Sequence, residues 1–289
     1  MHTQGLKTKI FLDGGDPQET RRAIELLGSL DGQTTNPTLI AKNPEAQERV
    51  ARGQGFSRAE VLGFYRKVVQ EIAGLIPNGS VSVEVYADAR TSADEMFEQG
   101  RDMFSWIPNA HIKFPITREG LRAAERTVQR GMRVNMTLCF TQAQAAAVYR
   151  ATTGAAKGDV FISPFVGRLD DRGENGMNLV ENILQMYRGG DGHVEVLAAS
   201  IRSVEHLLAA LQVGSDIATV PMQVLAAWRE KGFAVPRHDS VYAHEKLQHI
   251  PYQDIDLSRE WGSYNIAHEL TTKGIERFSE DWNALVRRE

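Results

Sequence analysis

The sequence of 289 residues contains a single cysteine, Cys139, so no disulfide can form within the chain. Such a low number of cysteines is typical of proteins in a reducing compartment. The N-terminal residues also lack the apolar stretch of a signal peptide, so we expect a cytoplasmic protein. No apolar run approaches the roughly 18 residues of a membrane-spanning helix, and we expect no membrane partner. The 33 basic and 37 acidic residues leave a net charge of −4, which argues against a nucleic-acid partner.

Eight short runs rich in Val, Ile, Phe and Thr recur along the chain, and segments with helical periodicity separate them. Such strict alternation favours a parallel sheet covered by helices. Eight units predict an α/β fold, the (β/α)8 TIM barrel. The alternative is a doubly wound open sheet, but the sequence has no G-x-G-x-x-G or Walker motif for the nucleotide that such sheets often bind. The runs begin near Lys9, Gly32, Val81, His111, Arg133, Val160, Val194 and Asp216.

Several intervening segments carry helix signals of their own. Residues 119–129 have an apolar face, and Thr117 is placed to cap their first turn. Residues 141–149 follow the next strand and begin with their own cap, Thr141. The long stretch between the second and third strands leaves room for an extra helix or a long loop around residues 51–76.

The end of the chain exceeds what a minimal barrel needs. Ile275, Phe278, Trp282 and Leu285 recur at helical spacing, which predicts a helix that packs its apolar face on the barrel. We therefore expect one catalytic barrel domain, residues 1–232, followed by a C-terminal helical extension, residues 233–289, that is not a separate domain.

Polar residues interrupt the predicted strands at alternating positions. Apolar neighbours on either side of Glu84 in the third strand and Lys113 in the fourth turn both side chains to the opposite face. The same alternation applies to Asp13 in the first strand and to Asn135 and Thr137 in the fifth. Because the apolar face of a barrel strand meets the helices, these polar side chains should converge inside the barrel, near the strand ends where barrel enzymes carry their chemistry.

A lysine among carboxylates can be interpreted as a structural ion pair or as part of a catalytic site. Lys113 and Glu84 could form a purely structural ion pair, but burying the whole set is costly, which favours a functional site. Desolvation lowers a lysine pKa, and the neutral amine can attack a ketone while a carboxylate moves protons. The eight histidines form no metal-binding H-x-x-x-H pair, so metal-dependent chemistry is a poorer fit and we expect no metal.

Two arginines follow neighbouring strands near the end of the predicted barrel. Arg168 comes shortly after Ser163, and Arg202 lies two residues after Ser200. Guanidinium groups with a hydroxyl nearby suit a phosphate group. Either arginine alone would be assigned to a surface ion pair, but two at adjacent strand ends favour an anionic ligand.

The short motifs, taken in order, resemble those of the transaldolase family, class I Schiff-base aldolases on a (β/α)8 barrel. Residues 34–40 (TTNPTLI) are close to the family signature T-T-N-P-[ST]-L, and residues 135–138 (NMTL) resemble its N-x-T-L strand. Residues 163–168 (SPFVGR) and 199–202 (ASIR) resemble two further strings. The resemblance extends over about residues 9–228, which is nearly the whole predicted barrel.

The resemblance implies a role for each matching residue. Lys113 would form the Schiff base, and Asp13 would remove the hydroxyl proton as the carbon–carbon bond breaks. Glu84 and Thr137 would hold a catalytic water and relay protons. Arg168, Ser200 and Arg202 are implied to bind the phosphate, within a substrate-binding set of Thr34, Asn36, Asn135, Ser163, Phe165, Arg168, Ser200 and Arg202.

The reaction implied by the resemblance belongs to the pentose phosphate pathway. A three-carbon dihydroxyacetone unit moves from fructose 6-phosphate to erythrose 4-phosphate, which gives sedoheptulose 7-phosphate and glyceraldehyde 3-phosphate. No cofactor is implied, because the imine nitrogen acts as the electron sink. The expected partners are sugar-phosphate substrates, and a homo-oligomer is left open.

Two alternatives remain. A fructose-6-phosphate aldolase would release free dihydroxyacetone, but those relatives tend to have glutamine at the position of Glu84 and tyrosine at that of Phe165, so this sequence favours transfer. A non-catalytic phosphosugar-binding barrel would have to explain why Lys113, Asp13 and Glu84 are all present. The chain also departs from the family at Gly14, where a hydroxyl residue is common, and its C-terminal tail is unlike that of the shorter members.

Overall fold

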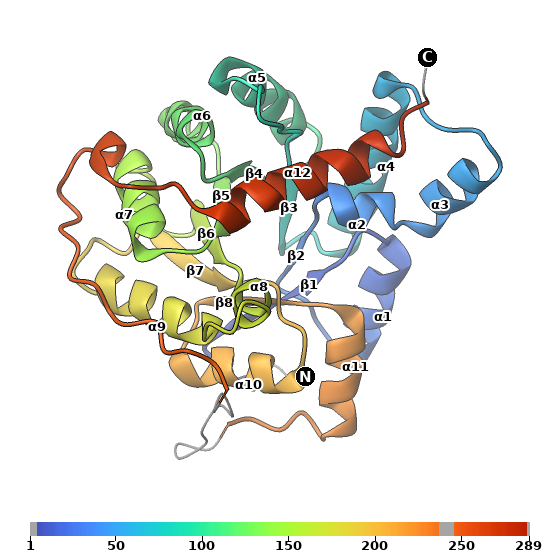
Figure 1. Cartoon of the computed structure of the whole chain (residues 1–289). Helices are drawn as coiled ribbons and strands as arrows, with labels where there is room; N and C mark the ends of the chain where they lie inside the picture. The colour runs from blue at the N-terminus through green and yellow to red at the C-terminus, as the bar shows by residue number, and fades with distance from the viewer. Residues whose placement is uncertain (1–4, 237–245, 288–289) are drawn as a thin grey trace.

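The computed structural model describes residues 5–236 and 246–287, and a closed barrel of eight parallel strands forms its centre (Figure 1). Each strand pairs with the next along the chain, and β8 pairs with β1. The predicted (β/α)8 barrel is therefore confirmed. The strands are β1 (Lys9–Asp13), β2 (Gly32–Thr34), β3 (Ser80–Glu84), β4 (Ala110–Pro115), β5 (Val134–Cys139), β6 (Val160–Pro164), β7 (Val194–Ala198) and β8 (Ile217–Val220).

Helices follow every strand and form the outer layer of the barrel (Figure 1). Their apolar faces and the outward faces of the strands form one continuous core. The helices of this layer are α1 (Pro17–Leu27), α4 (Arg58–Leu75), α5 (Ala93–Phe104), α6 (Arg118–Gln129), α7 (Gln142–Ala151), α9 (Gly176–Tyr187), α10 (Val204–Val213) and α11 (Met222–Glu230).

Other helices interrupt this regular pattern. The helix expected around residues 51–76 is α4 itself, and two short helices precede it after β2. Another short helix follows β6, and the C-terminal segment adds a single 3-10 turn and a long helix. These elements are α2 (Pro37–Ala41), α3 (Pro44–Ala51), α8 (Val166–Asp170), η1 (Trp261–Ser263) and α12 (Glu269–Asn283).

The caps expected for α6 and α7 are present. Thr117 Oγ1 accepts a hydrogen bond from the Gly120 backbone N–H at 2.9 Å. Thr141 Oγ1 accepts from the Gln144 N–H at 3.1 Å, and the Gln144 side chain accepts in return from the Thr141 N–H at 3.2 Å. This reciprocal capping box fixes the turn that leads from β5 into α7.

Helix α12 lies across the carboxyl end of the barrel, with α2 close to one end of it and β5 close to the other (Figure 1). Near its start, Thr271 Oγ1 donates to the Leu138 carbonyl oxygen at 3.0 Å. Near its end, Asp281 accepts from Thr38 Oγ1 of α2 at 2.5 Å. The predicted C-terminal helix is thus confirmed, and it closes part of the barrel mouth.

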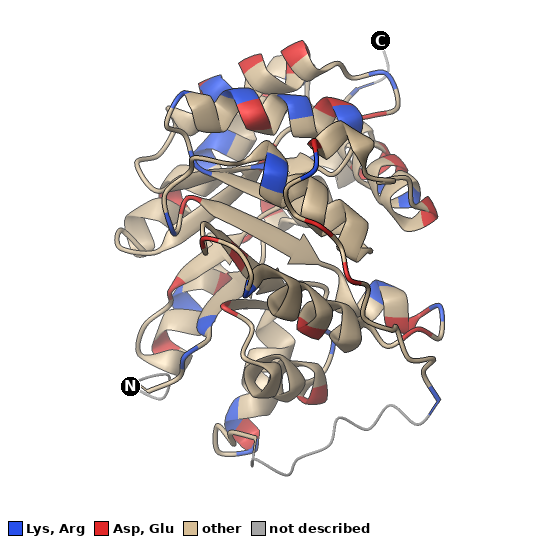
Figure 2. Ribbon diagram, turned by 90° about the vertical axis from the view of Figure 1, so that its left-hand side faces the viewer, with Lys and Arg blue, Asp and Glu red and all other residues tan. Residues whose placement is uncertain are grey.

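Lysines and arginines alternate with aspartates and glutamates on the surrounding helices (Figure 2). Many of these charges pair within one helix or between neighbouring helices, for example Arg126 with Asp94 and Lys67 with Glu45. Such exposed pairs contribute little stability each. Within residues 5–236 and 246–287, no helix has both the length and the apolar character to cross a membrane.

Candidate active site

The strand register brings the predicted polar residues to one end of the barrel interior. Asp13 of β1 is paired in register with Thr34 of β2, and Glu84 of β3 is paired with Lys113 of β4. Lys113 is also in register with Asn135 of β5. These residues lie at or near the carboxyl ends of their strands, the end at which barrel enzymes place their chemistry.

Lys113 and Glu84 form a buried ion pair. Both side chains are only 3–4% exposed, and Lys113 Nζ lies 2.9 Å from Glu84 Oε2. Lys113 Nζ also donates to the Thr35 carbonyl oxygen at 3.1 Å. Burial raises the pKa of Glu84, and the charge of Lys113 offsets part of that rise. The raised pKa makes Glu84 a better proton acceptor for its lysine neighbour than an exposed glutamate would be.

Two buried polar atoms near Lys113 have unused hydrogen-bonding capacity. Thr137 Oγ1 in β5 makes no hydrogen bond among the described residues, and neither does Glu84 Oε2. The short contact of Glu84 Oε2 with Lys113 is therefore an electrostatic contact without the direction of a hydrogen bond. Because buried polar atoms usually have a partner, these two atoms on either side of β4 are suited to hold a small polar molecule.

Asp13 sits on the other side of the barrel interior and is partly buried. Thr34 Oγ1 donates to Asp13 Oδ1 at 2.8 Å and lies 2.6 Å from the hydroxyl of Thr219 in β8. Burial raises the pKa of Asp13, while the charge of Lys113 and the hydrogen bond from Thr34 oppose the rise. Asp13 is therefore a positioned carboxyl group with raised basicity.

Asn135 and Ser163 belong to a chain of hydrogen bonds in the barrel interior. Ser163 Oγ donates to Asn135 Oδ1 at 2.7 Å, and Asn135 Nδ2 donates to Ser82 Oγ at 3.0 Å. These bonds fix the amide orientation of Asn135 next to Lys113.

A cavity of about 280 Å³ opens at the barrel mouth above Lys113. Most of the predicted site residues line it together, whereas Glu84, Asn135 and Thr137 are absent from its wall and are buried in the barrel. The predicted residues in the wall are Asp13, Thr34, Asn36, Lys113, Ser163, Phe165, Arg168, Ser200 and Arg202.

The sequence reasoning missed several residues of this wall. Thr38 and Leu39 stand inside the motif already quoted, and Thr219 lies on a strand whose alternation could have placed it inward. Nothing in the sequence pointed to the others, because they come from helices whose position over the barrel is set only by tertiary packing. The missed residues are Thr38, Leu39, Lys42, Ala199, Thr219, Arg277 and Phe278, of which Ala199 also stands inside a motif already quoted.

Arg168 does not end the sixth strand, as the sequence had indicated, but lies in the short helix α8. Strand β6 stops at Pro164, and the backbone N–H groups of Val166 and Gly167 donate to the carbonyl oxygens of Ala199 and Ser200 after β7, where the chain turns into a helix. Burial lowers the pKa of the Arg168 guanidinium, and nearby Glu84 opposes that effect. Among the described residues, no carboxylate forms an ion pair with Arg168.

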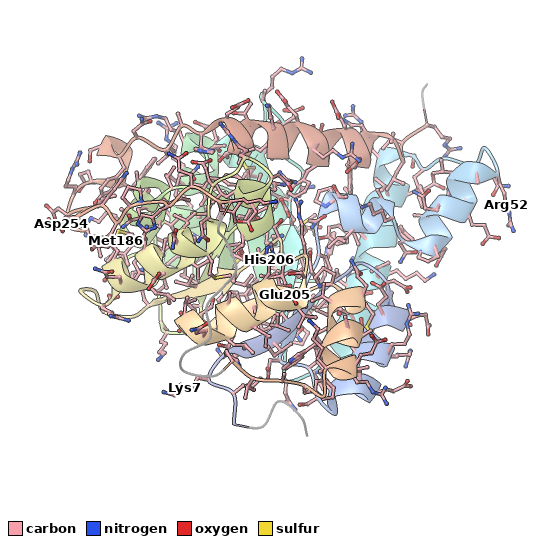
Figure 3. All side chains as sticks on the ribbon, turned by 60° about the horizontal axis from the view of Figure 1, so that its bottom comes forward. Lys7, Arg52, Met186, Glu205, His206 and Asp254 are labelled. Carbon is pink, nitrogen blue, oxygen red and sulfur yellow. The ribbon has the colours of Figure 1, made fainter. Side chains whose placement is uncertain are left out.

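Arg202 has a different environment, in the loop between β7 and α10. Its Nη1 donates to Asp171 Oδ1 at 2.5 Å, and the side chain is about half exposed. The Arg202 backbone N–H donates to Nδ1 of His206, a residue of α10 labelled in Figure 3, and His206 Nε2 lies 3.0 Å from Asp170 Oδ2. Helices α8 and α10 thus hold the loop that presents Arg202.

The backbones at Gly167 and Ser200 approach each other closely on the side of the cavity that carries Arg168 and Arg202. Ser200 adopts a left-handed conformation, with φ of 57°. A Cβ atom on Gly167 would lie 2.5 Å from the Ser200 carbonyl oxygen and 2.6 Å from Arg202 Nε. Only glycine at position 167 lets the two segments and the Arg202 side chain meet in this way.

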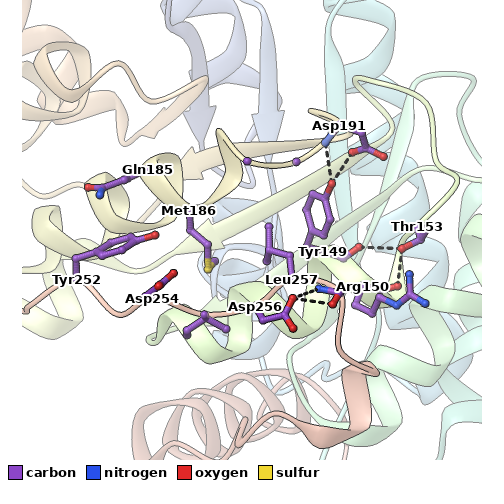
Figure 4. A pocket seen from close by; sticks show the side chains of 14 residues that line it. Tyr149, Arg150, Thr153, Gln185, Met186, Asp191, Tyr252, Asp254, Asp256 and Leu257 are labelled. Atoms are coloured by element: carbon purple, nitrogen blue, oxygen red, sulfur yellow. Dashed lines mark hydrogen bonds between the residues drawn. The ribbon is translucent and has the colours of Figure 1, made fainter.

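A wider cavity of about 600 Å³ lies on the outer side of the molecule, between α7, α9 and residues 252–258 (Figure 4). Tyr149 is the most connected residue in its wall: its hydroxyl donates to Asp191 Oδ1 at 2.9 Å and accepts from the Asp191 N–H at 2.8 Å. The wall has no lysine, and its carboxylates are exposed. Hydrogen bonds lower the pKa of Asp191 and Asp256 in this wall, whereas burial raises the pKa of Asp13 and Glu84 at the barrel mouth. Within residues 5–236 and 246–287, no three His, Cys, Asp or Glu side chains cluster as metal ligands would.

Comparison with known proteins gives matches over almost the whole chain. The profile of the transaldolase/fructose-6-phosphate aldolase family matches residues 10–289. A protein of Dehalococcoides mccartyi named "Probable transaldolase" is 35% identical over 279 residues, which cover 96% of this chain and 100% of that protein. "Probable transaldolase 2" of Listeria monocytogenes is 34% identical over 97% of this chain and 99% of its own length. A "Probable transaldolase" of Anaeromyxobacter dehalogenans is 39% identical over 75% of this chain and 87% of its own.

Proposed function

We propose that this chain, which belongs to the transaldolase/fructose-6-phosphate aldolase family, is a transaldolase that moves a dihydroxyacetone unit between sugar phosphates through a Schiff base on Lys113. The observation that carries the proposal is the buried Lys113–Glu84 pair beneath a cavity that is also lined by Asp13 and three arginines. The relatives named transaldolase, which match this chain over most of its length, support it.

Imine formation requires a neutral lysine. Glu84 lies 2.9 Å from Lys113 Nζ and, with its raised pKa, accepts the ammonium proton so that the free amine attacks C2 of fructose 6-phosphate. The resulting carbinolamine loses its hydroxyl group as water after a proton reaches that oxygen. Glu84 and Thr137 hold this water, because each has a buried oxygen atom that lacks a hydrogen-bond partner among the described residues.

Carbon–carbon cleavage requires a base at the C4 hydroxyl group. Asp13 takes that proton, the C4–O bond becomes a carbonyl, and the electrons of the C3–C4 bond move into the imine to give an enamine. Glyceraldehyde 3-phosphate leaves. Thr34 holds the Asp13 carboxylate by a hydrogen bond of 2.8 Å, which fixes its orientation for this step.

Transfer is the reverse of this cleavage with another aldehyde. The enamine attacks the carbonyl carbon of erythrose 4-phosphate, and Asp13 returns its proton to the new hydroxyl oxygen. Water then hydrolyses the imine and sedoheptulose 7-phosphate leaves. The phosphate of each sugar binds at Arg168, Ser200 and Arg202, and since no described carboxylate pairs with Arg168, its donors are available to an anion.

The competing activity is aldol cleavage with release of dihydroxyacetone. Release requires water to reach the enamine and protonate it. The side chain at position 165 has no hydroxyl group, and Phe165 instead packs against Phe140 with 5.9 Å between the ring centroids. This apolar wall favours an enamine that persists until an acceptor arrives.

The test is an assay of glyceraldehyde 3-phosphate release from fructose 6-phosphate, with and without erythrose 4-phosphate. We expect sustained release only with the acceptor, and a burst of about one equivalent per chain without it. Lys113→Met, which keeps the length of the side chain without the amine, is the control and should show no burst. Equal sustained rates without acceptor would identify an aldolase, and no release in either case would favour a non-catalytic phosphosugar-binding barrel.

A further inference from the structure

The C-terminal helix α12 reaches the phosphate side of the cavity. Its residues Arg277 and Phe278 stand in the same wall as Arg168, Ser200 and Arg202. Phe278 is buried, and it comes from a part of the chain more than 100 residues after Arg168. The environment of Arg168 indicates what Phe278 contributes to this wall.

Aromatic rings, not carboxylates, hold Arg168. Its guanidinium carbon lies 5.3 Å from the centroid of the Phe165 ring and 5.5 Å from that of the Phe278 ring. Both distances are in the range of a cation–π contact. Such contacts orient the guanidinium group but do not neutralise it and do not occupy its N–H donors. Arg202, by contrast, already gives one donor to Asp171.

The packing of α12 against Arg168 is close. One turn before Phe278, a Cβ atom on Gly274 would lie 2.8 Å from Arg168 Nη1 and 2.6 Å from Leu138 Cδ2. Hydrogen bonds anchor the helix on both sides of this point, through Thr271 near its start and Asp281 near its end. The backbone of α12 therefore limits where the Arg168 side chain can lie.

We propose that Phe278 is a positioning residue for the phosphate site: from α12 it holds Arg168 with its N–H donors directed to the phosphate of the substrate. This inference rests on the proposed function, because it concerns the phosphorylated end of the same substrates. Through Phe278, the C-terminal helix makes the site selective for phosphorylated sugars.

The test compares Phe278→Leu with Phe278→Tyr in the full chain. We measure the KM for fructose 6-phosphate and the inhibition constant of inorganic phosphate, which binds only the phosphate site. Phe278→Leu should raise both by about three- to tenfold, as expected for the loss of a partly desolvated cation–π contact, and by more than any change in kcat. Phe278→Tyr keeps the ring and should restore both values to within about twofold of the original.

A matched control separates positioning from helix docking. Trp282 is buried one turn further along α12 and packs on Tyr65, with 5.8 Å between ring centroids, away from the cavity wall. Trp282→Leu should weaken the packing of α12 on α4 without raising the inhibition constant of phosphate. If Phe278→Leu misfolds by circular dichroism, Gly274→Ala provides the second variant, because its Cβ would lie 2.8 Å from Arg168 Nη1 and 2.6 Å from Leu138 Cδ2 and so displaces the guanidinium group while the Phe278 ring is kept.

An equal rise of the phosphate inhibition constant in Phe278→Leu and Trp282→Leu would overturn the inference. So would a phosphate inhibition constant that stays unchanged in both Phe278→Leu and Gly274→Ala. Either result leaves the transfer activity of the unaltered chain intact, so the proposed function would stand. Failure of the proposed function is a separate result, because the unaltered chain would then show no transfer of the three-carbon unit to erythrose 4-phosphate, whatever the variants do to the phosphate inhibition constant.

Discussion

At the scale of single residues, the two carboxyl groups of the site share one electrostatic feature. Burial raises the pKa of both Asp13 and Glu84, and Lys113 compensates only part of the effect. A base works best when its pKa is near the working pH. Burial of the two carboxylates costs desolvation free energy, but the raised pKa makes both groups better proton acceptors. Activity should accordingly fall as the pH falls through these raised values, because both groups must be ionised to act.

This feature predicts that Asp13→Asn stabilises the protein at neutral pH while it abolishes cleavage. The folded-state pKa of Asp13 lies above its ordinary value of 3.8, so the charged form is disfavoured in the folded protein and reduces stability above the folded pKa. An uncharged asparagine can still accept the hydrogen bond from Thr34. We therefore expect a higher Tm for Asp13→Asn than for the original chain at pH 7.

Thermal unfolding of the original chain and Asp13→Asn across a pH series checks this prediction. The difference in Tm should shrink as the pH falls, and disappear below the ordinary pKa of 3.8, where both side chains are uncharged. A variant that is less stable than the original at pH 7 would show that the carboxylate of Asp13 is stabilised by its neighbours.

At the scale of elements, the turn from β4 into α6 determines how Lys113 is presented. A Cβ atom on Gly120 would lie 1.9 Å from the carbonyl oxygen of Pro115, the last residue of the lysine strand. Helix α6 therefore packs directly on the end of that strand, and only glycine fits at the contact.

We predict that Gly120→Ala destabilises the protein by about 1–3 kcal/mol, because the helix or the strand end must move. The matched control is Gly63→Ala, at an exposed position in α4 where no atom lies within 4 Å of the added methyl group. That change should stabilise by about 0.5–1 kcal/mol through helix propensity. Urea unfolding measures the free energy of unfolding of both variants. Equal values for the two would contradict the close contact at Gly120.

The sequence allowed most of these elements to be predicted, for physical reasons that particular residues illustrate. Alternation along β3 and β4 identified the inward side chains Glu84 and Lys113, because a strand turns successive residues to opposite faces. Caps such as Thr117 act within one turn of helix, so they too can be read locally.

What could not be predicted depends on contacts between distant segments. The apolar face of α12 was visible in the spacing of Phe278 and Trp282, but not its position across the barrel mouth. The same holds for Tyr65 of α4, whose hydroxyl group accepts from the Glu84 N–H at 2.8 Å and lies 2.6 Å from Thr35 Oγ1. Neither contact has a signal in the local sequence.

At the scale of the whole molecule, a chain with a net charge of −4 gathers positive charge where the cavity opens. Lys42 and Arg277 line the cavity together with Arg168 and Arg202, while most other charges alternate in sign over the outer helices (Figure 2). Such a local positive field attracts anionic substrates to the mouth of an otherwise acidic protein. Because α12 contributes to this wall, we propose that residues 233–289 are an extension of the barrel domain, not a domain of their own.

Borohydride trapping is the most direct way to identify the residue that bonds to the sugar, which we propose is Lys113. Incubation with fructose 6-phosphate and borohydride should reduce the imine to a stable secondary amine, one per chain, on the peptide that contains Lys113. Lys42 provides the control, since it is a second lysine in the same cavity wall. We expect that Lys42→Met still forms the adduct and that Lys113→Met does not. An adduct on any other lysine, or none at all, would contradict this proposal.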